Sequence, residues 1–311
     1  MSYKKRVLIV GGSNMELTLN VMRLPDKGES LKDDGGASFS AGGGVANAAV
    51  ALSKLGAEVV LTTKLGMDLY GQKLYSYYKS AGINTSLIKV DRDFATGLTV
   101  SLKEADGSSR KINFPGANDH LGEDAISEGF SSSPDALYVN FESSVNLALK
   151  CAKIAEARKV PIFIDASPAD ANIPLERFPE AEIFSLGEAE TQRYTGIKPL
   201  GSQESLRAAF ALWRKVHAKY IVINQGVRGA MIYDGKRCEI VSPTIVKRAV
   251  DMKAANDAFT AALTLEYLRI RDIKAAVKYA IAAAAITVSR YGSSSSVPTR
   301  EEIESEMAKE L

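Results

Sequence analysis

Short apolar segments that alternate with helix-type patterns constrain the fold of this chain more than any other feature. Five segments have the pattern of buried strands: residues 6–10, 59–65, 136–141, 160–164 and 220–224. Helix-type patterns lie between them, notably at residues 71–81, 145–158 and 205–217. Strands that alternate with helices build a mostly parallel sheet with helices on its faces. Polar residues or glycines recur where these strands end, which is the edge at which open α/β sheets bind ligands.

Two segments interrupt this alternation and predict a second, smaller sheet. The first, at about residues 15–40, is polar and contains several glycines. The second, at about residues 94–115, holds two strand-type runs on either side of Asp106-Gly107, a pair typical of hairpin turns. Both segments leave the α/β core and return to it. We therefore expect one domain, residues 1–311, with a small antiparallel β lid.

The composition argues against several functional classes. The 311 residues carry a net charge of +2 without a dense basic patch, so nucleic-acid binding is not indicated. His120 and His217 are the only histidines, which argues against a histidine metal site or a Ser-His-Asp triad. Cys151 and Cys238 form no disulfide framework, so we expect a cytoplasmic protein. The longest apolar run, residues 275–288, is too short for a membrane span.

A glycine-rich segment early in the chain predicts the start of a helix with a binding role. Three glycines, residues 42–44, open an alanine-rich helix that Gly56 would end. Such a helix entry, with Asn47 buried beside it, could bind sugar hydroxyls through backbone N–H groups and the side-chain amide. Close packing of the helix on a sheet explains the alanines equally well, but it does not explain Asn47.

Residues 250–259 predict a strand, a tight turn and a helix that continues into the apolar run 258–268. Asn256 or Asp257 would lie near the helix start. Unpaired backbone N–H groups and the helix dipole favour an anion there. Asp257 could then act as a base towards a hydroxyl beside a bound phosphate. The alternative is that Asp257 only caps a buried helix.

Two signatures in these segments resemble the ribokinase family of sugar kinases, the PfkB-type carbohydrate kinases. The first is Gly42-Gly43 followed by Asn47 and Ala48. The second is Asp251 with Ala254-Ala255-Asn256-Asp257-Ala258-Phe259, against a usual D-T-x-G/A-A-G-D-x-F. The connecting motifs follow in family order: Gly116-Ala117-Asn118, Gly226-x-Arg228-Gly229 and residues 282–298. The likeness runs from Val7 to about Ile303, and within the family the sequence is most similar to ribokinases.

The resemblance implies a three-layer α/β/α sandwich with a mostly parallel central sheet and a small antiparallel β lid. It also implies an ATP-dependent kinase that transfers the γ-phosphoryl group to a hydroxyl of ribose or a similar sugar. Another pentose, a ketohexose or a nucleoside stays open as substrate. Magnesium would act together with ATP, and potassium would be a further cation. The lid would join two copies of the chain in a homodimer.

By position, the resemblance assigns residues to each part of such a site. The sugar-binding residues are Asn14, Glu16, Gly42, Gly43, Asn47, Glu142 and Asp257. Asp257 is the expected catalytic base, beside an anion hole formed by Ala254, Ala255 and Asn256 with the N–H of Asp257. The nucleotide-binding residues are Gly187, Asn224, Gly226, Arg228, Gly229 and Ala283. Glu190 is linked to magnesium, and the monovalent-cation ring matches Asp251, Lys253, Thr287, Arg290, Gly292 and Ser296.

Three departures from the family pattern fall on the phosphate side. Gly187 stands where the acidic motif normally begins with Asn, Met252 replaces a Thr, and Asn256 replaces the Gly before the catalytic Asp. If that Gly has a positive φ, Asn tolerates the conformation best, although its amide would crowd the anion hole. The departures leave open a sugar- or nucleotide-binding protein with weak or lost kinase activity. On the sugar side, Glu16 stands where ribokinases usually carry Asp.

Lys253 leaves three roles open. Its ammonium could enter the monovalent-cation site and replace potassium, or turn to the nucleotide phosphates. It could also face the solvent without a role, as surface lysines commonly do.

Overall fold

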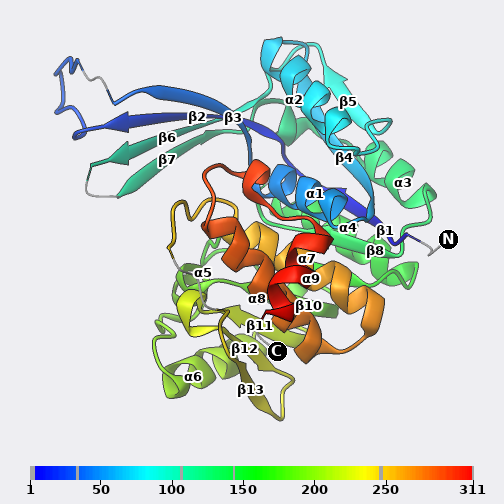
Figure 1. Ribbon diagram of the computed structural model, residues 1–311. Helices are drawn as coiled ribbons and strands as arrows, with labels where there is room; N and C mark the ends of the chain where they lie inside the picture. The colour runs from blue at the N-terminus through cyan, green and yellow to red at the C-terminus, as the bar shows by residue number, and fades with distance from the viewer. Residues whose placement is uncertain (1–3, 33–34, 106–107, 143, 245–247, 310–311) are drawn as a thin grey trace.

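The computed structural model describes residues 4–32, 35–105, 108–142, 144–244 and 248–309. Its centre is a nine-stranded sheet (Figure 1). In sheet order the strands are β13 (Cys238–Val241), β12 (Ala230–Tyr233), β11 (Ala218–Asn224), β10 (Ala181–Leu186), β9 (Ile162–Asp165), β8 (Ala136–Val139), β1 (Arg6–Val10), β4 (Glu58–Gly66) and β5 (Ile88–Asp91). In sheet order from β11 to β5, every two adjacent strands pair in parallel. Strands β12 and β13 pair antiparallel at the other edge of the sheet.

Helices cover both faces of this sheet, which is why central strands such as β1, β8 and β9 are mostly apolar and buried. One face carries α1 (Gly44–Lys54), α2 (Leu69–Ser80), α7 (Ala255–Ile270), α8 (Ile273–Val288) and α9 (Arg300–Ala308). The other face carries α3 (Glu123–Ser131), α4 (Val145–Ala157), α5 (Glu188–Thr195) and α6 (Ser202–Trp213). A separate apolar core fills each side. This arrangement confirms the predicted three-layer α/β/α sandwich.

A second sheet of four strands extends away from the main sheet (Figure 1). Its order is β3 (Ala37–Gly42), β2 (Asn14–Val21), β6 (Gly97–Glu104) and β7 (Ser109–Phe114). The β2–β3 and β6–β7 ladders are antiparallel, as predicted for two excursions, whereas β2 and β6 join the two excursions in parallel. The predicted turn at Asp106-Gly107 lies outside the described residues.

The described residues just before α7 do not form the predicted strand, part of which lies outside the described residues. Residues 248–254 form no strand, and the N–H groups of Val250 and Asp251 donate to the carbonyl of Val288 at the end of α8, at 2.7 and 3.3 Å. The β-branched Val250 therefore belongs to a loop packed against a helix end, and a ladder partner is missing among the described strands.

Candidate active site

A cavity of about 230 Å³ lies where the small sheet meets the carboxyl ends of the main strands. Loops after β8 and β9 and the starts of α1, α5 and α7 contribute to its lining. The lining residues are Glu16, Gly43, Gly44, Asn47, Thr99, Lys111, Asn113, Asn140, Glu142, Ser167, Pro168, Glu190, Lys253, Ala254, Asp257 and Ser293. The cavity thus brings together Glu16, Gly43, Asn47, Glu142 and Asp257 of the predicted sugar site.

Three polar atoms of this lining lack a hydrogen-bond partner within the described residues: Glu16 Oε1, Asn140 Nδ2 and Glu142 Oε2. Buried polar groups are nearly always paired in folded proteins. Three partnerless atoms around one cavity leave it free to form hydrogen bonds with a polar ligand. Asn140 was not predicted, because a single Asn after a strand carries no distinctive sequence signal.

Helix α7 begins at the predicted anion hole, but its strained residue is not the predicted one. Ala254 has φ 56°, in the left-handed region, and precedes the first helical residue, Ala255. The first i to i−4 bond of the helix runs from Ala258 N to Ala254 O, at 2.8 Å. Asn256 lies inside the first turn without a positive φ, so the condition under which Asn would be favoured for its backbone conformation is not met.

Asp257 is held by a short chain of hydrogen bonds. Asn47 Nδ2 of α1 donates to Asp257 Oδ2 at 2.8 Å, and Ser293 Oγ donates to Asn47 Oδ1 at 2.8 Å. Both Asn47 and Ser293 are buried. Asn47 therefore has a polar task that close helix packing does not explain. Ser293 lies in the run of serines at 293–296, where the sequence does not distinguish one serine from the next.

Three carboxyl groups near the cavity have raised pKa values. Burial raises the pKa of Glu142 to about 7, assisted by the charge of Asp257 and opposed by the N–H groups of Gly44 and Val45. Burial likewise raises the pKa of Asp257, while the hydrogen bond from Asn47 lowers it. Burial and the charge of Asp257 raise the pKa of Asp165. A base whose pKa is raised towards neutrality accepts a proton more readily.

The small sheet turns a polar face to the cavity. Glu16, Thr99 and Asn113 stand side by side across β2, β6 and β7. Lys111 Nζ lies 3.9 Å from Glu16 Oε1, so a cation of β7 faces the carboxylate of β2. Lys111, Thr99 and Asn113 were not predicted, because the strand period alone does not say which face of a two-sided polar strand meets the core.

The glycines of the first signature make room for these carboxylates. A Cβ on Gly42 would lie 2.7 Å from Glu16 Cβ, and one on Gly43 would lie 2.8 Å from Glu142 Oε2. Gly43 also has φ 93°, which only glycine adopts readily. Asn14 is not part of the lining: it is buried and bonded to Thr99 and Asn118 at 3.3 and 2.7 Å.

Most of the residues predicted for the nucleotide lie together beyond the start of α7. Asn224 Nδ2 donates to Asn256 Oδ1 at 2.8 Å, and Gly226 N donates to Asn224 Oδ1 at 3.1 Å. Arg228 pairs with Glu188 of α5 at 2.6 Å, next to Gly187. Gly229 has φ 88°, and a Cβ there would lie 2.0 Å from the Val241 carbonyl.

Ala283 does not join this group at the surface. It is fully buried within α8, and its carbonyl accepts from Thr287 Oγ1 at 2.8 Å.

The residues matched to the cation ring lie around the loop before α7, but most of their side chains have other partners. Ser296 Oγ donates to the Ser293 carbonyl, and Arg290 pairs with Glu302. The carboxylate of Asp251 accepts from the N–H groups of Lys253 and Gly292, at 3.1 and 3.4 Å.

Lys253 points towards the small sheet. Its Nζ donates to Thr18 Oγ1 on β2 at 3.1 Å, and it lines the cavity. A different lysine, Lys103 of β6, lies near the carboxylate of Asp251, with 3.9 Å between Nζ and Oδ1. Thr18 Oγ1 is therefore one partner of the half-buried Lys253 ammonium, whose other two N–H groups are left for a ligand or solvent.

No group of three or more His, Cys, Asp or Glu side chains within the described ranges is arranged to hold a metal ion. Magnesium in phosphate-transfer sites needs only one or two carboxylates, because the substrate phosphates supply further oxygens. Glu190 lines the cavity, and its Oε2 accepts from Gly187 N at 3.2 Å. This side chain fits such a role.

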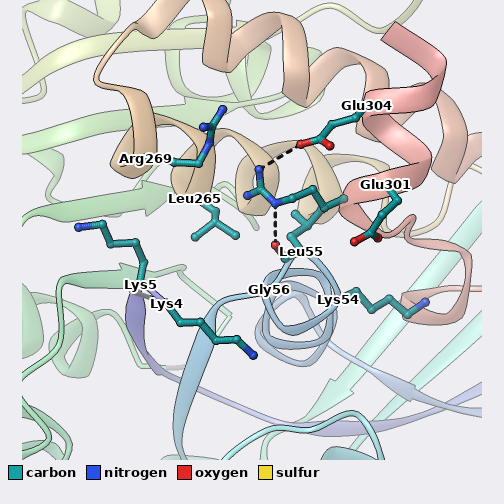
Figure 2. A pocket seen from close by; sticks show the side chains of 10 residues that line it. Lys4, Lys5, Lys54, Leu55, Gly56, Leu265, Arg269, Glu301 and Glu304 are labelled. Carbon is teal, nitrogen blue, oxygen red and sulfur yellow. Dashed lines mark hydrogen bonds and ion pairs between the residues drawn. The ribbon is translucent and has the colours of Figure 1, made fainter. Parts of the chain in front are cut away.

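A second cavity, of about 710 Å³, lies between the end of α1 and the start of α9 (Figure 2). Its lining is rich in cations, several of which have partners. Lys54 Nζ donates to three carbonyls of residues 294–297, and Arg300 contacts Glu266, Glu304 and the Leu55 carbonyl. None of the three partnerless cavity atoms lies there. We therefore place the active site in the smaller cavity.

Comparison with known proteins agrees with this site. A family model described as pfkB family carbohydrate kinase matches residues 4–300, so the chain belongs to that family. The chain is 26% identical over 301 residues to the ribokinase of Haemophilus influenzae, covering 96% of this chain and 97% of the relative. It is 25% identical over 298 residues to the deoxyribokinase of Salmonella typhi, covering 95% and 96%.

The fold of the chain is also that of solved relatives. Ribokinase of Arabidopsis thaliana, solved in complex with ribose and ATP, has a TM-score of 0.86 at 23% identity, covering 98% of this chain and 99% of that one. The predicted family and fold are therefore confirmed. Within the described residues, no helix combines the length and the apolar character needed to cross a membrane.

Proposed function

We propose that this carbohydrate kinase transfers the γ-phosphoryl group of ATP to a hydroxyl of ribose or a similar sugar, with Asp257 as the base. The observation that carries the proposal is the cavity in which a carboxylate at a helix start faces three partnerless polar atoms. The solved relative bound to ribose and ATP supports both substrates. Glu16 and Glu142 suit neighbouring sugar hydroxyls, because each carboxylate can accept two hydrogen bonds.

In the proposed reaction, Asp257 accepts the proton of the sugar hydroxyl as its oxygen bonds to the γ-phosphorus. The bond from that phosphorus to the β-phosphate oxygen breaks, and ADP leaves. The N–H groups of Ala255, Asn256 and Asp257 at the start of α7 stabilise the charge on the transferring group. Gly226, Arg228 and Gly229 bind along the nucleotide. Glu190 would help to hold magnesium, which would supply further charge neutralisation at the phosphates.

The departures on the phosphate side leave this chemistry possible. Met252 is 66% exposed. The absence of a Thr hydroxyl at this exposed position therefore leaves no buried polar group without a hydrogen-bond partner. Asn256 has a helical backbone and a bonded side chain. The binding-only alternative therefore gains no support from these positions.

A monovalent cation beside Asp251 also belongs to the proposal. The loop that carries Asp251 leads directly into the start of α7, so an ion that orders the loop would act on the anion hole. Because most matched side chains are engaged elsewhere, backbone carbonyls would hold potassium, together with the Asp251 carboxylate.

We further propose that the small sheet acts as a lid and joins two chains in a homodimer. The face opposite Glu16 is apolar: Leu17, Phe39, Val100 and Ile112 stand in one row across its four strands, and Phe114 lies beside them. Phe39, Ile112 and Phe114 are each more than half exposed. An exposed apolar face of this kind is typical of an interface.

Both cysteines are free, with Cys151 buried and Cys238 exposed. An exposed free thiol suits the reducing cytoplasm, which we propose as the location.

The experiment that tests the function measures ADP release with a panel of ribose, deoxyribose, other pentoses, ketohexoses and nucleosides. Calorimetry with the same sugars and with ATP accompanies it. We expect sugar-dependent ADP release for at least one pentose. Binding of sugar and ATP without ADP release for any compound would favour the binding-only alternative.

A further inference from the structure

Gly187 is a glycine for reasons of space and not of conformation. Its φ of −91° and ψ of −175° describe extended backbone that any residue adopts. A Cβ at this position, however, would lie 2.6 Å from Asn256 Nδ2 and 2.7 Å from Glu190 Oε2. The side chain of Asn256 therefore occupies the space that a side chain at 187 would need.

The amide of Asn256 has a fixed orientation. Its Oδ1 accepts from Asn224 Nδ2 at 2.8 Å, and Asn224 Oδ1 accepts in turn from Gly226 N at 3.1 Å. This chain links the first turn of α7 to the loop at Gly226. Asn256 Oδ1 is engaged by Asn224, and Asn256 Nδ2 lies beside Gly187.

We propose that Asn256 supplies a side-chain N–H donor to the nucleotide phosphates, and that Gly187 is required to make room for it. The inference rests on the proposed function, because the phosphates lie between the start of α7 and Glu190 only if the site binds ATP. Gly187 stands where the family has Asn, and Asn256 stands where it has Gly. The two departures are thus one exchange, in which the amide has moved from the residue before α5 to the first turn of α7.

The substitution Asn256→Asp tests the donor directly. Asp has the same shape and still accepts from Asn224, but it cannot donate and it places a negative charge near the phosphates. We expect calorimetry to give at least a tenfold weaker affinity for ATP, with sugar affinity unchanged and no drop in the thermal unfolding midpoint. Because the added negative charge alone would weaken ATP binding, Asn256→Leu, a neutral side chain of similar size without an N–H donor, should weaken it as well. Unchanged ATP affinity in Asn256→Leu would overturn the proposal.

The exchange itself is tested with Gly187→Asn, Asn256→Gly and the double variant. Gly187→Asn alone should lower the unfolding midpoint and weaken ATP binding, because two amides compete for one space. The double variant should bind ATP more tightly than either single variant. If its loss of affinity equals the product of the two single losses, the residues act independently and the proposal is wrong.

Gly122→Asn is the matched control. Gly122 also precedes a helix, α3, with φ −84° and ψ 169°, but its neighbour there is Asp124 and not Asn256. This variant should leave ATP affinity unchanged. Calorimetry needs no turnover, so a wild-type protein that binds ATP but phosphorylates no sugar would contradict the proposed function alone. A wild-type protein that binds no ATP would contradict both.

Discussion

Glu142 is a buried carboxyl of the cavity lining whose raised pKa makes the stability of the protein depend on pH. Burial and the charge of Asp257 raise the pKa of Glu142 to about 7 in the folded chain. In the unfolded chain the same carboxyl has its ordinary pKa of 4.5 and loses its proton above that pH. A raised carboxyl pKa contributes its full stability below the unfolded value and loses it as the pH rises through the folded value. The free energy of unfolding should therefore fall by about 2 kcal/mol between pH 5 and pH 8 on account of Glu142.

Glu142→Gln removes this titration and should flatten the pH dependence. Urea unfolding at pH 5 and pH 8 measures it, and Glu176→Gln, an exposed glutamate, serves as the control. An unchanged difference between the two pH values in Glu142→Gln would contradict the raised pKa.

Ser293 is a positioning residue for the base through Asn47. Ser293→Ala removes a donor worth about 1 kcal/mol, which frees the Asn47 amide to rotate. We expect kcat to fall roughly fivefold with little change in the sugar KM. Ser295→Ala, at an exposed neighbour, should leave kcat unaltered. Equal effects of the two variants would mean that the Ser293 contact does not position Asp257.

At the scale of elements, the sequence predicted those parts that follow from local pattern. The buried strands, the glycine-opened α1 and the hairpin of β6 and β7 all carry period or turn signals, and Gly56 does follow the end of α1 with φ 96°. Residues 248–251 lie in a loop where a strand was predicted, because the pattern around Val250 cannot reveal that Val288 is the hydrogen-bond partner. The parallel pairing of β2 and β6 is likewise non-local.

The same limit applies to the candidate site. The family signatures place Asp257, Asn47, Glu16 and Glu142 at one cavity, but Lys111 enters it only through the register of β7 on β6. Register depends on pairing between distant segments, so the sequence alone gave no reason to choose Lys111 over other lid lysines.

The contact between Lys253 and Thr18 joins the α7 loop to β2. Lys253→Met and Thr18→Val should each raise the sugar KM about threefold, and the double variant should be no worse than either, because the two changes remove one bond worth about 0.5–1.5 kcal/mol. Initial rates over a range of sugar concentrations measure this. Multiplied effects in the double variant would contradict the contact.

The response to potassium distinguishes the contact between Lys253 and Thr18 from the alternative in which the Lys253 ammonium replaces potassium. If the ammonium replaced potassium, only Lys253→Met would gain a dependence on added potassium chloride.

For the whole molecule, the apolar outer face of the small sheet predicts a homodimer. Phe114→Lys should place a charge in the interface and shift the protein to a monomer in sedimentation velocity. Phe210→Lys is the matched control, because Phe210 on α6 is 54% exposed and Phe114 is 53% exposed. A wild-type chain that sediments as a monomer at micromolar concentration would exclude this interface.

The central claim concerns the whole assembly of fold, cavity and helix start: the chain transfers a phosphoryl group with Asp257 as its base. The most direct measurement is sugar-dependent ADP release by the wild-type protein and by Asp257→Asn, which keeps an acceptor for Asn47 but is not a base. Loss of a general base should lower kcat by roughly 10²–10⁴-fold while calorimetry still detects sugar binding. A variant that turns over at the wild-type rate would contradict the account.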